Sequence, residues 1–227
     1  MKQIFDNSCY DILPAENGFI AILLQEDDEG RKYFCYKYVS ALNPDISRPL
    51  TKQTFLSAKF HDSYDTLAMQ IENHIRTMVV WPTNNTVFAV SSGTGNAKML
   101  KNDGSLIWQG GIMYKDEAPS SIAMYNDTLW CSFPSSNALI RFNLRTMREE
   151  LRIGGPTDAA FNKPNGIWID EIDDTMYVCS SGSGKVTGVN LKTFTVNEHL
   201  SFEEPVKKYF RIGPSEIIML DSGVYVL

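Results

Sequence analysis

Short apolar segments alternate with turn-forming residues along this chain, and one such pattern occurs four times. In each copy a small or polar pair precedes an apolar segment, a turn of Asn, Asp or Gly follows, and a second apolar segment carries an aromatic residue near its start. Segments of this length, bounded by such turns, predict short antiparallel strands. The second-segment aromatics lie 42, 47 and 48 residues apart and are Phe88, Trp130, Tyr177 and Tyr225.

The clearest repeat predicts four strands, at residues 166–170, 176–180, 185–190 and 194–199. The same pattern places third and fourth strands at 97–100 and 106–112 in the repeat before Trp130, and at 138–143 and 149–153 in the next. Nearer the N-terminus, strands are predicted at 17–23, 32–39, 55–60 and 66–71, with an insertion around 43–50. A repeat of this length with four short strands is typical of one blade of a β-propeller.

The two ends of the chain complete the count. The last repeat begins at Pro214 and stops at Leu227 after two predicted strands, whereas residues 2–6 and 10–13 predict two strands with no preceding pair. Pairing the termini closes the ring and removes exposed strand edges. We therefore predict a single all-β domain, a five-bladed β-propeller whose final blade is closed by pairing of N- and C-terminal strands. The predicted blades are 17–75, 76–118, 119–163, 164–205, and 206–227 with 1–13.

Composition narrows the classes of partner. The formal net charge is −6, which disfavours nucleic acid because phosphate binding needs a concentrated basic face. No apolar run reaches the 18 residues of a membrane span, and the N-terminus lacks the apolar region of a signal peptide. We expect a cytoplasmic, monomeric protein with no membrane partner.

The four cysteines form no Cys-x-x-Cys pair. Cys131 and Cys179 occupy the same place in two repeats, which predicts small apolar core residues rather than a disulfide framework. The histidines His61, His74 and His199 have no metal-ligand spacing, so surface or strand-edge positions are favoured for them. No nucleophile or zinc motif occurs, and we assign no catalytic residue.

The segment from Phe161 to Val178 contains Pro164-Asn165-Gly166, an apolar strand ending in Asp170, and Tyr177-Val178 after a tight turn. It resembles an NHL repeat and the blade signature of the gluconolactonase/regucalcin-like propellers. One blade matches well and three match faintly. The chain departs from the NHL pattern at Ser180 and Lys185. In the gluconolactonase-like enzymes the Asn of this triplet is a ligand of the catalytic divalent metal, and Asn165 matches it.

Residues just before the first strand of each blade are expected to surround one mouth of the central channel. They are Asn17, Arg76, Ser120, Asn165 and Ser215, with Glu216 beside them. Ca²⁺ normally needs carboxylates, but the five equivalent positions offer none, and the Arg76 guanidinium would repel a cation. We therefore predict no cofactor and no tightly bound metal. A plain structural role of Asn165 and Gly166 in the turn before an inner strand is favoured.

Two classes of function remain open. The first is a non-catalytic binding module that presents a ligand- or protein-binding face around the central funnel. Its ligand would be a small polar molecule, such as an anion paired with Arg76. The second is a metal-dependent lactonase or esterase of the gluconolactonase type, which rests on Asn165 alone. The binding module is favoured, enzymatic activity stays open, and it is about as plausible that the channel residues only satisfy one another and ordered water.

Overall fold

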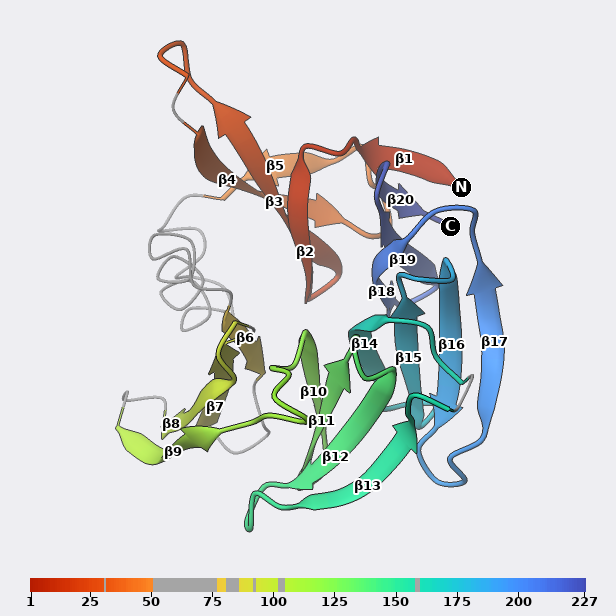
Figure 1. Cartoon of the computed structure of the whole chain (residues 1–227). Helices are drawn as coiled ribbons and strands as arrows, with labels where there is room; N and C mark the ends of the chain where they lie inside the picture. Colours follow the sequence, from red (N-terminus) through yellow and green to blue (C-terminus); the bar gives the residue numbers. More distant parts are fainter. Residues whose placement is uncertain (31, 51–76, 81–85, 92, 102–104, 158–159) are drawn as a thin grey trace.

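The computed structural model describes residues 1–30, 32–50, 77–80, 86–91, 93–101, 105–157 and 160–227. These residues form no helix, and therefore none that could cross a membrane. Their strands make five antiparallel four-stranded sheets arranged around a common centre, which is a five-bladed β-propeller (Figure 1). The predicted fold class is confirmed.

We number the blades in chain order and give the strands of each from the centre outward. Blade 1 contains β2 (Cys9–Ala15), β3 (Gly18–Glu26), β4 (Lys32–Ser40) and β5 (Ser47–Pro49). Blade 2 contains β6 (Thr77–Val80), β7 (Thr86–Ser91), β8 (Asn96–Lys101) and β9 (Leu106–Gly111). Blade 3 contains β10 (Ser121–Tyr125), β11 (Thr128–Phe133), β12 (Ala138–Asn143) and β13 (Glu149–Gly154).

Blade 4 contains β14 (Pro164–Asp170), β15 (Thr175–Ser180), β16 (Lys185–Asn190) and β17 (Val196–Ser201). Blade 5 contains β18 (Val206–Ile212), β19 (Ser215–Leu220), β20 (Gly223–Val226) and, as its outermost strand, β1 (Lys2–Phe5). The antiparallel register sets Lys2 opposite Val226 and Phe5 opposite Val224. Closure of the ring by the two ends of the chain is therefore confirmed.

The division of strands in the closing blade differs from the prediction. Three C-terminal strands and one N-terminal strand form blade 5, whereas two from each end were expected. Residues 10–13, assigned to the closing blade, belong instead to β2, the inner strand of blade 1. The reason is the tight hairpin at Asn17, whose φ of 57° lets β2 turn directly into β3 with Ala15 opposite Gly18. Asn in such a conformation is typical of a hairpin turn.

The same error affects the last repeat. Gly213, with a φ of 57°, joins β18 to β19, so Ser215 begins a second strand rather than an inner one. In blade 1 the predicted first and second strands are likewise the second and third. The outermost strand of blade 1 is β5, which lies within the segment around 43–50 that was expected to be an insertion. The strands predicted at 55–60 and 66–71 lie outside the described residues.

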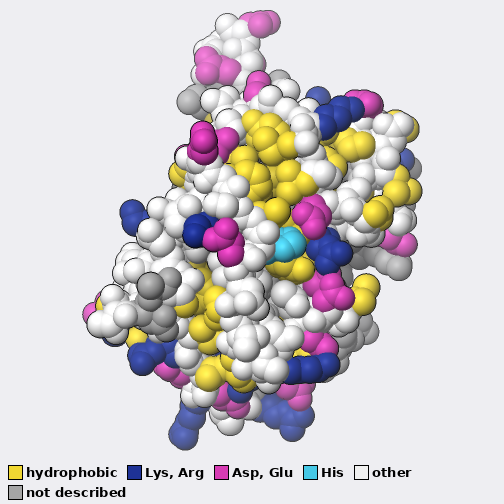
Figure 2. Space-filling view, turned by 90° about the vertical axis from the view of Figure 1, so that its right-hand side faces the viewer, with side chains coloured by type: hydrophobic (Ala, Val, Ile, Leu, Met, Phe, Trp, Pro, Cys, Tyr) yellow, Lys and Arg dark blue, Asp and Glu magenta, His cyan; other side chains and the backbone are white. Residues whose placement is uncertain are grey.

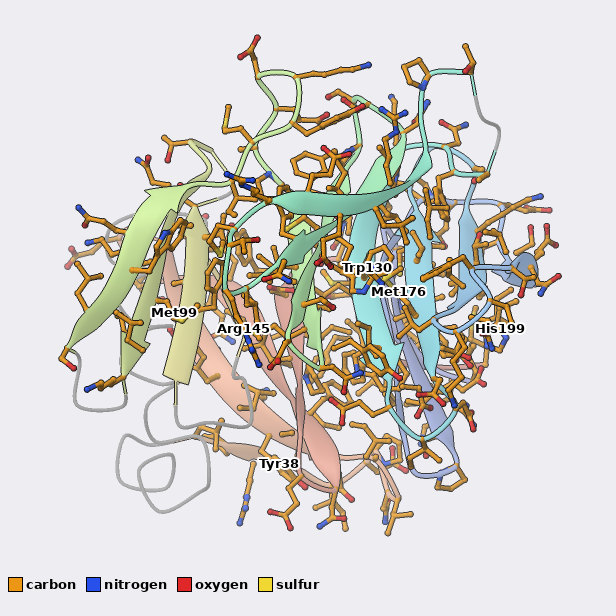
Figure 3. The ribbon with its side chains drawn as sticks, turned by 90° about the horizontal axis from the view of Figure 1, so that it is seen from below. Tyr38, Met99, Trp130, Arg145, Met176 and His199 are labelled. Carbon is orange, nitrogen blue, oxygen red and sulfur yellow. The ribbon has the colours of Figure 1, made fainter. Side chains whose placement is uncertain are left out.

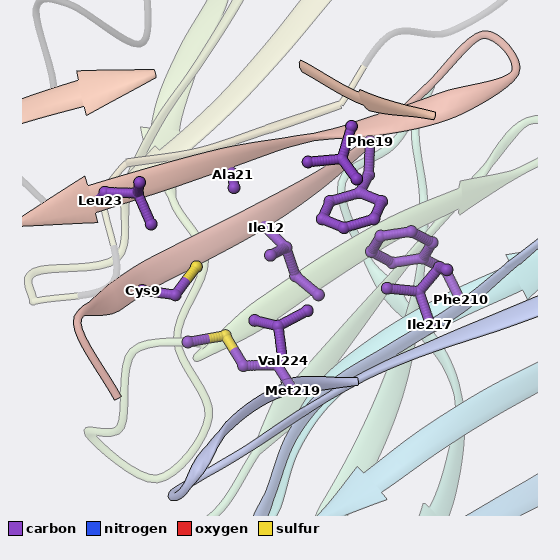
Figure 4. Close-up of a cluster of buried hydrophobic side chains, with 10 residues drawn as sticks. Cys9, Ile12, Phe19, Ala21, Leu23, Phe210, Ile217, Met219 and Val224 are labelled. Carbon is purple, nitrogen blue, oxygen red and sulfur yellow. The ribbon is translucent and has the colours of Figure 1, made fainter. Parts of the chain in front are cut away.

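The core lies between neighbouring blades. Figure 4 shows one cluster, in which side chains of β2 and β3 meet those of blade 5. The rings of Phe19 and Phe210 meet there edge to face, with centroids 6.2 Å apart. Ile12, Ile217 and Val224 are fully buried beside them. Because this cluster joins the two ends of the chain, closure of the ring rests on apolar burial as well as on strand pairing.

The cysteines are free, and three of them are buried: Cys9, Cys131 and Cys179. Burial raises the pKa of each of these thiols, that of Cys9 to about 12. We expect iodoacetamide at pH 8 to modify the half-buried Cys35 first, because the thiolate is the reactive form and needs access. Mass spectrometry of the native protein should find at most one fast adduct, and urea-unfolded protein four. Rapid modification of Cys9 in the native state would contradict the packing of blade 1 against blade 5.

Candidate functional site

The predicted ring of channel residues forms only in part. Ser120 and Asn165 do lie together: the Ser120 hydroxyl is 3.0 Å from the Asn165 carbonyl oxygen, to which it can donate, and 3.0 Å from the Ser132 hydroxyl. Both residues lie where an inner strand begins. The Ser120 hydroxyl is thus engaged with the Asn165 main chain and with Ser132, as in the structural alternative for the channel.

Asn17 and Ser215 lie at the other end of the inner strands, which corrects the prediction. Each lies at the hairpin that follows an inner strand, and neighbouring inner strands run in the same direction, since the starts of β10 and β14 adjoin. Both residues contact Ala41: the Ala41 N–H donates to the Asn17 carbonyl at 3.1 Å, and the Ser215 hydroxyl donates to the Ala41 carbonyl at 2.9 Å. Arg76 lies outside the described residues.

Glu216 points to a different place, the boundary between blades 4 and 5. Four aromatic rings meet there, from β14, β15, β17 and β18. The His199 centroid lies 4.8 Å from that of Tyr177 and 5.5 Å from that of Tyr209, and Tyr177 stacks on Trp168 at 5.8 Å. Tyr177 and Tyr209 are buried, while the His199 side chain is 30% exposed. The rings make a rigid apolar base for the polar groups beside them.

Hydrogen bonds and ion pairs surround this aromatic cluster. His199 Nε2 lies 2.9 Å from the Tyr209 hydroxyl and 3.6 Å from Glu216 Oε1. Burial, together with the nearby Glu216 carboxylate, raises the pKa of the Tyr209 phenol, so the phenol stays protonated near neutral pH. On the other side, Arg211 Nη1 lies 3.0 Å from Asp173 Oδ2 and 3.4 Å from Asp170 Oδ2. The cluster therefore ties the two blades together.

A groove of 270 Å³ opens on the face of blade 4 next to this cluster and shares Tyr177 and His199 with it. Gly188 forms its floor, and its rim includes Thr175, Asn190 and Asn197. Figure 3 shows His199 at the periphery of the molecule, on the strand farthest from the inner strands. The face that includes β17 carries a histidine with acidic and basic side chains beside it and hydrophobic side chains around them (Figure 2).

Two local features create the groove. Opposite Tyr177 in the next strand stands Gly188, whereas the equivalent partners in blades 2 and 3 are Met99 and Arg141. The missing side chain leaves the hollow. A β-bulge between β16 and β17 then leaves His199 without a strand partner, and bulges often redirect a side chain in this way.

The prediction from sequence missed this groove. It favoured a surface or strand-edge position for His199. The presence of Gly188 where other blades have a long side chain was visible only by aligning the repeats strand by strand. Among the described residues, no group of three His, Cys, Asp or Glu side chains could hold a metal ion. The chemistry available at the groove is hydrogen bonding beside aromatic rings.

No protein-family model and no curated protein sequence matches this chain. Solved structures do share its fold. A streptogramin B lyase covers 96% of this chain and 92% of its own, with a TM-score of 0.52 and 13% identity. Virginiamycin B lyase from Staphylococcus aureus covers 92% of this chain and 72% of its own, with a TM-score of 0.53 and 12% identity. The computationally designed Ika8 protein covers 95% and 69%, with a TM-score of 0.51 and 10% identity.

These likenesses concern the fold alone, because every identity is low. The chain is a β-propeller, in agreement with its strand order. The resemblance of residues 161–178 to NHL repeats and gluconolactonase-like blades stays a prediction.

Proposed function

We propose that this chain is a non-catalytic binding module and that its ligand binds in the groove of blade 4. The observation that carries the proposal is the hollow above Gly188, bounded by the rings of Tyr177 and His199. Propellers use a rigid ring of sheets to present such sites. Because the aromatic cluster fixes both rings, the groove is formed before any ligand arrives, which lowers the entropic cost of binding.

This proposal moves the binding face from the central funnel to the boundary of blades 4 and 5. Of the predicted funnel residues that the structure describes, Glu216 alone is recorded beside the new site, 3.6 Å from His199. The alternative of a metal-dependent hydrolase has no supporting observation among the described residues. We therefore favour binding over hydrolysis.

Filling the groove tests the proposal. A Cβ added at Gly188 would lie 3.5 Å from the nearest atom, a Thr175 methyl carbon, so a side chain fits there. We expect Gly188→Val to fold normally and to bury the floor of the groove. In ligand-observed NMR with a library of small polar fragments, at least one fragment should bind the wild type, and the Gly188→Val substitution should weaken it by tenfold or more.

The matched control is Gly111→Val, another glycine-to-valine change within a strand. An added Cβ at Gly111 has no atom within 4 Å, and the residue lies in blade 2. This variant should bind the same fragments as the wild type. If no fragment distinguishes Gly188→Val from the wild type, the groove is not a binding site and the proposal is wrong.

A further inference from the structure

Charge at the groove is balanced, which restricts the ligand. Glu198, at the rim, forms an ion pair of 2.6 Å with Lys185. Next to the groove, Arg211 is paired with Asp170 and Asp173, and Glu216 lies 4.0 Å from the Arg211 guanidinium. A charged ligand would have to compete with a partner already in place. The site therefore suits a neutral molecule.

Two hydrogen-bonding groups at the rim have fixed roles. The Thr175 hydroxyl donates to the Asp173 carbonyl at 3.1 Å, so it offers its lone pairs to a ligand. The Asn190 side-chain oxygen accepts from the N–H groups of Lys192 and Thr193, at 3.0 and 2.9 Å, so this amide has its NH₂ group to offer.

Thr175 and Asn190 are direct cross-strand partners, so the acceptor and the donor lie side by side. A hydroxyl group both donates and accepts, and neighbouring hydroxyls on one ring satisfy such a pair.

The volume and the aromatic wall complete the chemistry. At 270 Å³ the groove lies just below the roughly 300 Å³ at which pockets for drug-sized ligands begin, so it suits a single small ring. The His199 ring, whose side chain is 30% exposed and which packs on the buried Tyr177, offers a flat surface for the C–H face of that ring. We infer that the groove binds one sugar ring of a neutral carbohydrate. This inference rests on the proposed binding function of the groove.

Titration with sugars tests the inference on the full chain. The probes are neutral methyl glycosides of glucose, galactose, mannose and N-acetylglucosamine, with galacturonic acid and glucosamine as charged comparators. Saturation-transfer NMR should detect at least one neutral glycoside, with both charged sugars bound at least tenfold more weakly. Thr175→Val removes the fixed acceptor at nearly constant shape and should weaken the bound glycoside about fivefold.

Thr128→Val is the matched control, because Thr128 pairs with Asn143 in blade 3 as Thr175 pairs with Asn190 in blade 4. It should leave sugar binding unchanged. Charged sugars that bind as well as neutral ones would overturn the inference, and so would the failure of every neutral glycoside. If fragments still distinguish Gly188→Val from the wild type in that case, the carbohydrate assignment fails and the binding groove stands. If they do not, both proposals fail.

Discussion

Removing residues 1–6 is expected to make the protein aggregate or unfold to a large extent. The deletion takes away β1, which pairs only with β20 within the described part of the chain. It exposes the edge of β20 to other molecules, and a free strand edge promotes aggregation. It also removes Ile4 and Phe5, which pack against the buried cluster between blades 1 and 5. Size-exclusion chromatography and urea denaturation measure both effects.

Two controls separate strand closure from loss of surface charge. Lys2→Ala removes only the exposed ion pair with Asp45 and should cost no more than about 1 kcal/mol. A synthetic peptide of residues 1–7, added in excess to the truncated protein, should restore the fold by completing blade 5. A truncated protein with the elution volume and urea midpoint of the full chain would refute closure by β1.

Blades 3 and 4 could be predicted strand by strand, because their hydrophobic pattern and turns agree. The third strands at 138–143 and 185–190 have the same bounds in the structure. In blades 1 and 5 the predicted strands were assigned one place off. Asn17-Gly18 and Gly213-Pro214 are turn signals that fit either the start of an inner strand or the hairpin after it. Only the pairing partners decide between these, and they lie elsewhere in the sequence.

The prediction of the channel residues depended on that strand assignment. Equivalent residues surround one mouth of the channel only when every strand is assigned to its correct place in its blade, so the shift moved Asn17 and Ser215 to the other end of the inner strands. The groove was even harder to predict from the sequence. It needs a bulge at His199 and a glycine opposite Tyr177, and neither feature changes the hydrophobic pattern from which the strands were predicted.

Replacing Gly166 by alanine is expected to destabilise the protein by about 3 kcal/mol, the upper part of the usual cost of overpacking. Gly166 lies in β14, immediately after Asn165, where the inner strands of blades 4 and 5 approach closely. A Cβ at this position would lie 2.4 Å from the Lys207 carbonyl oxygen. Because that oxygen belongs to the backbone of β18, relief requires an inner strand to shift. The urea midpoint measures the loss.

Gly188→Ala in the same blade is the matched control. Its Cβ would meet nothing closer than 3.5 Å, so its free energy of unfolding should change by no more than about 0.5 kcal/mol. Equal midpoints for the two variants would show that the close approach of β14 to β18 is wrong. A large loss at Gly166 alone would instead give the Pro164-Asn165-Gly166 triplet a packing role, sufficient to account for this motif without a metal.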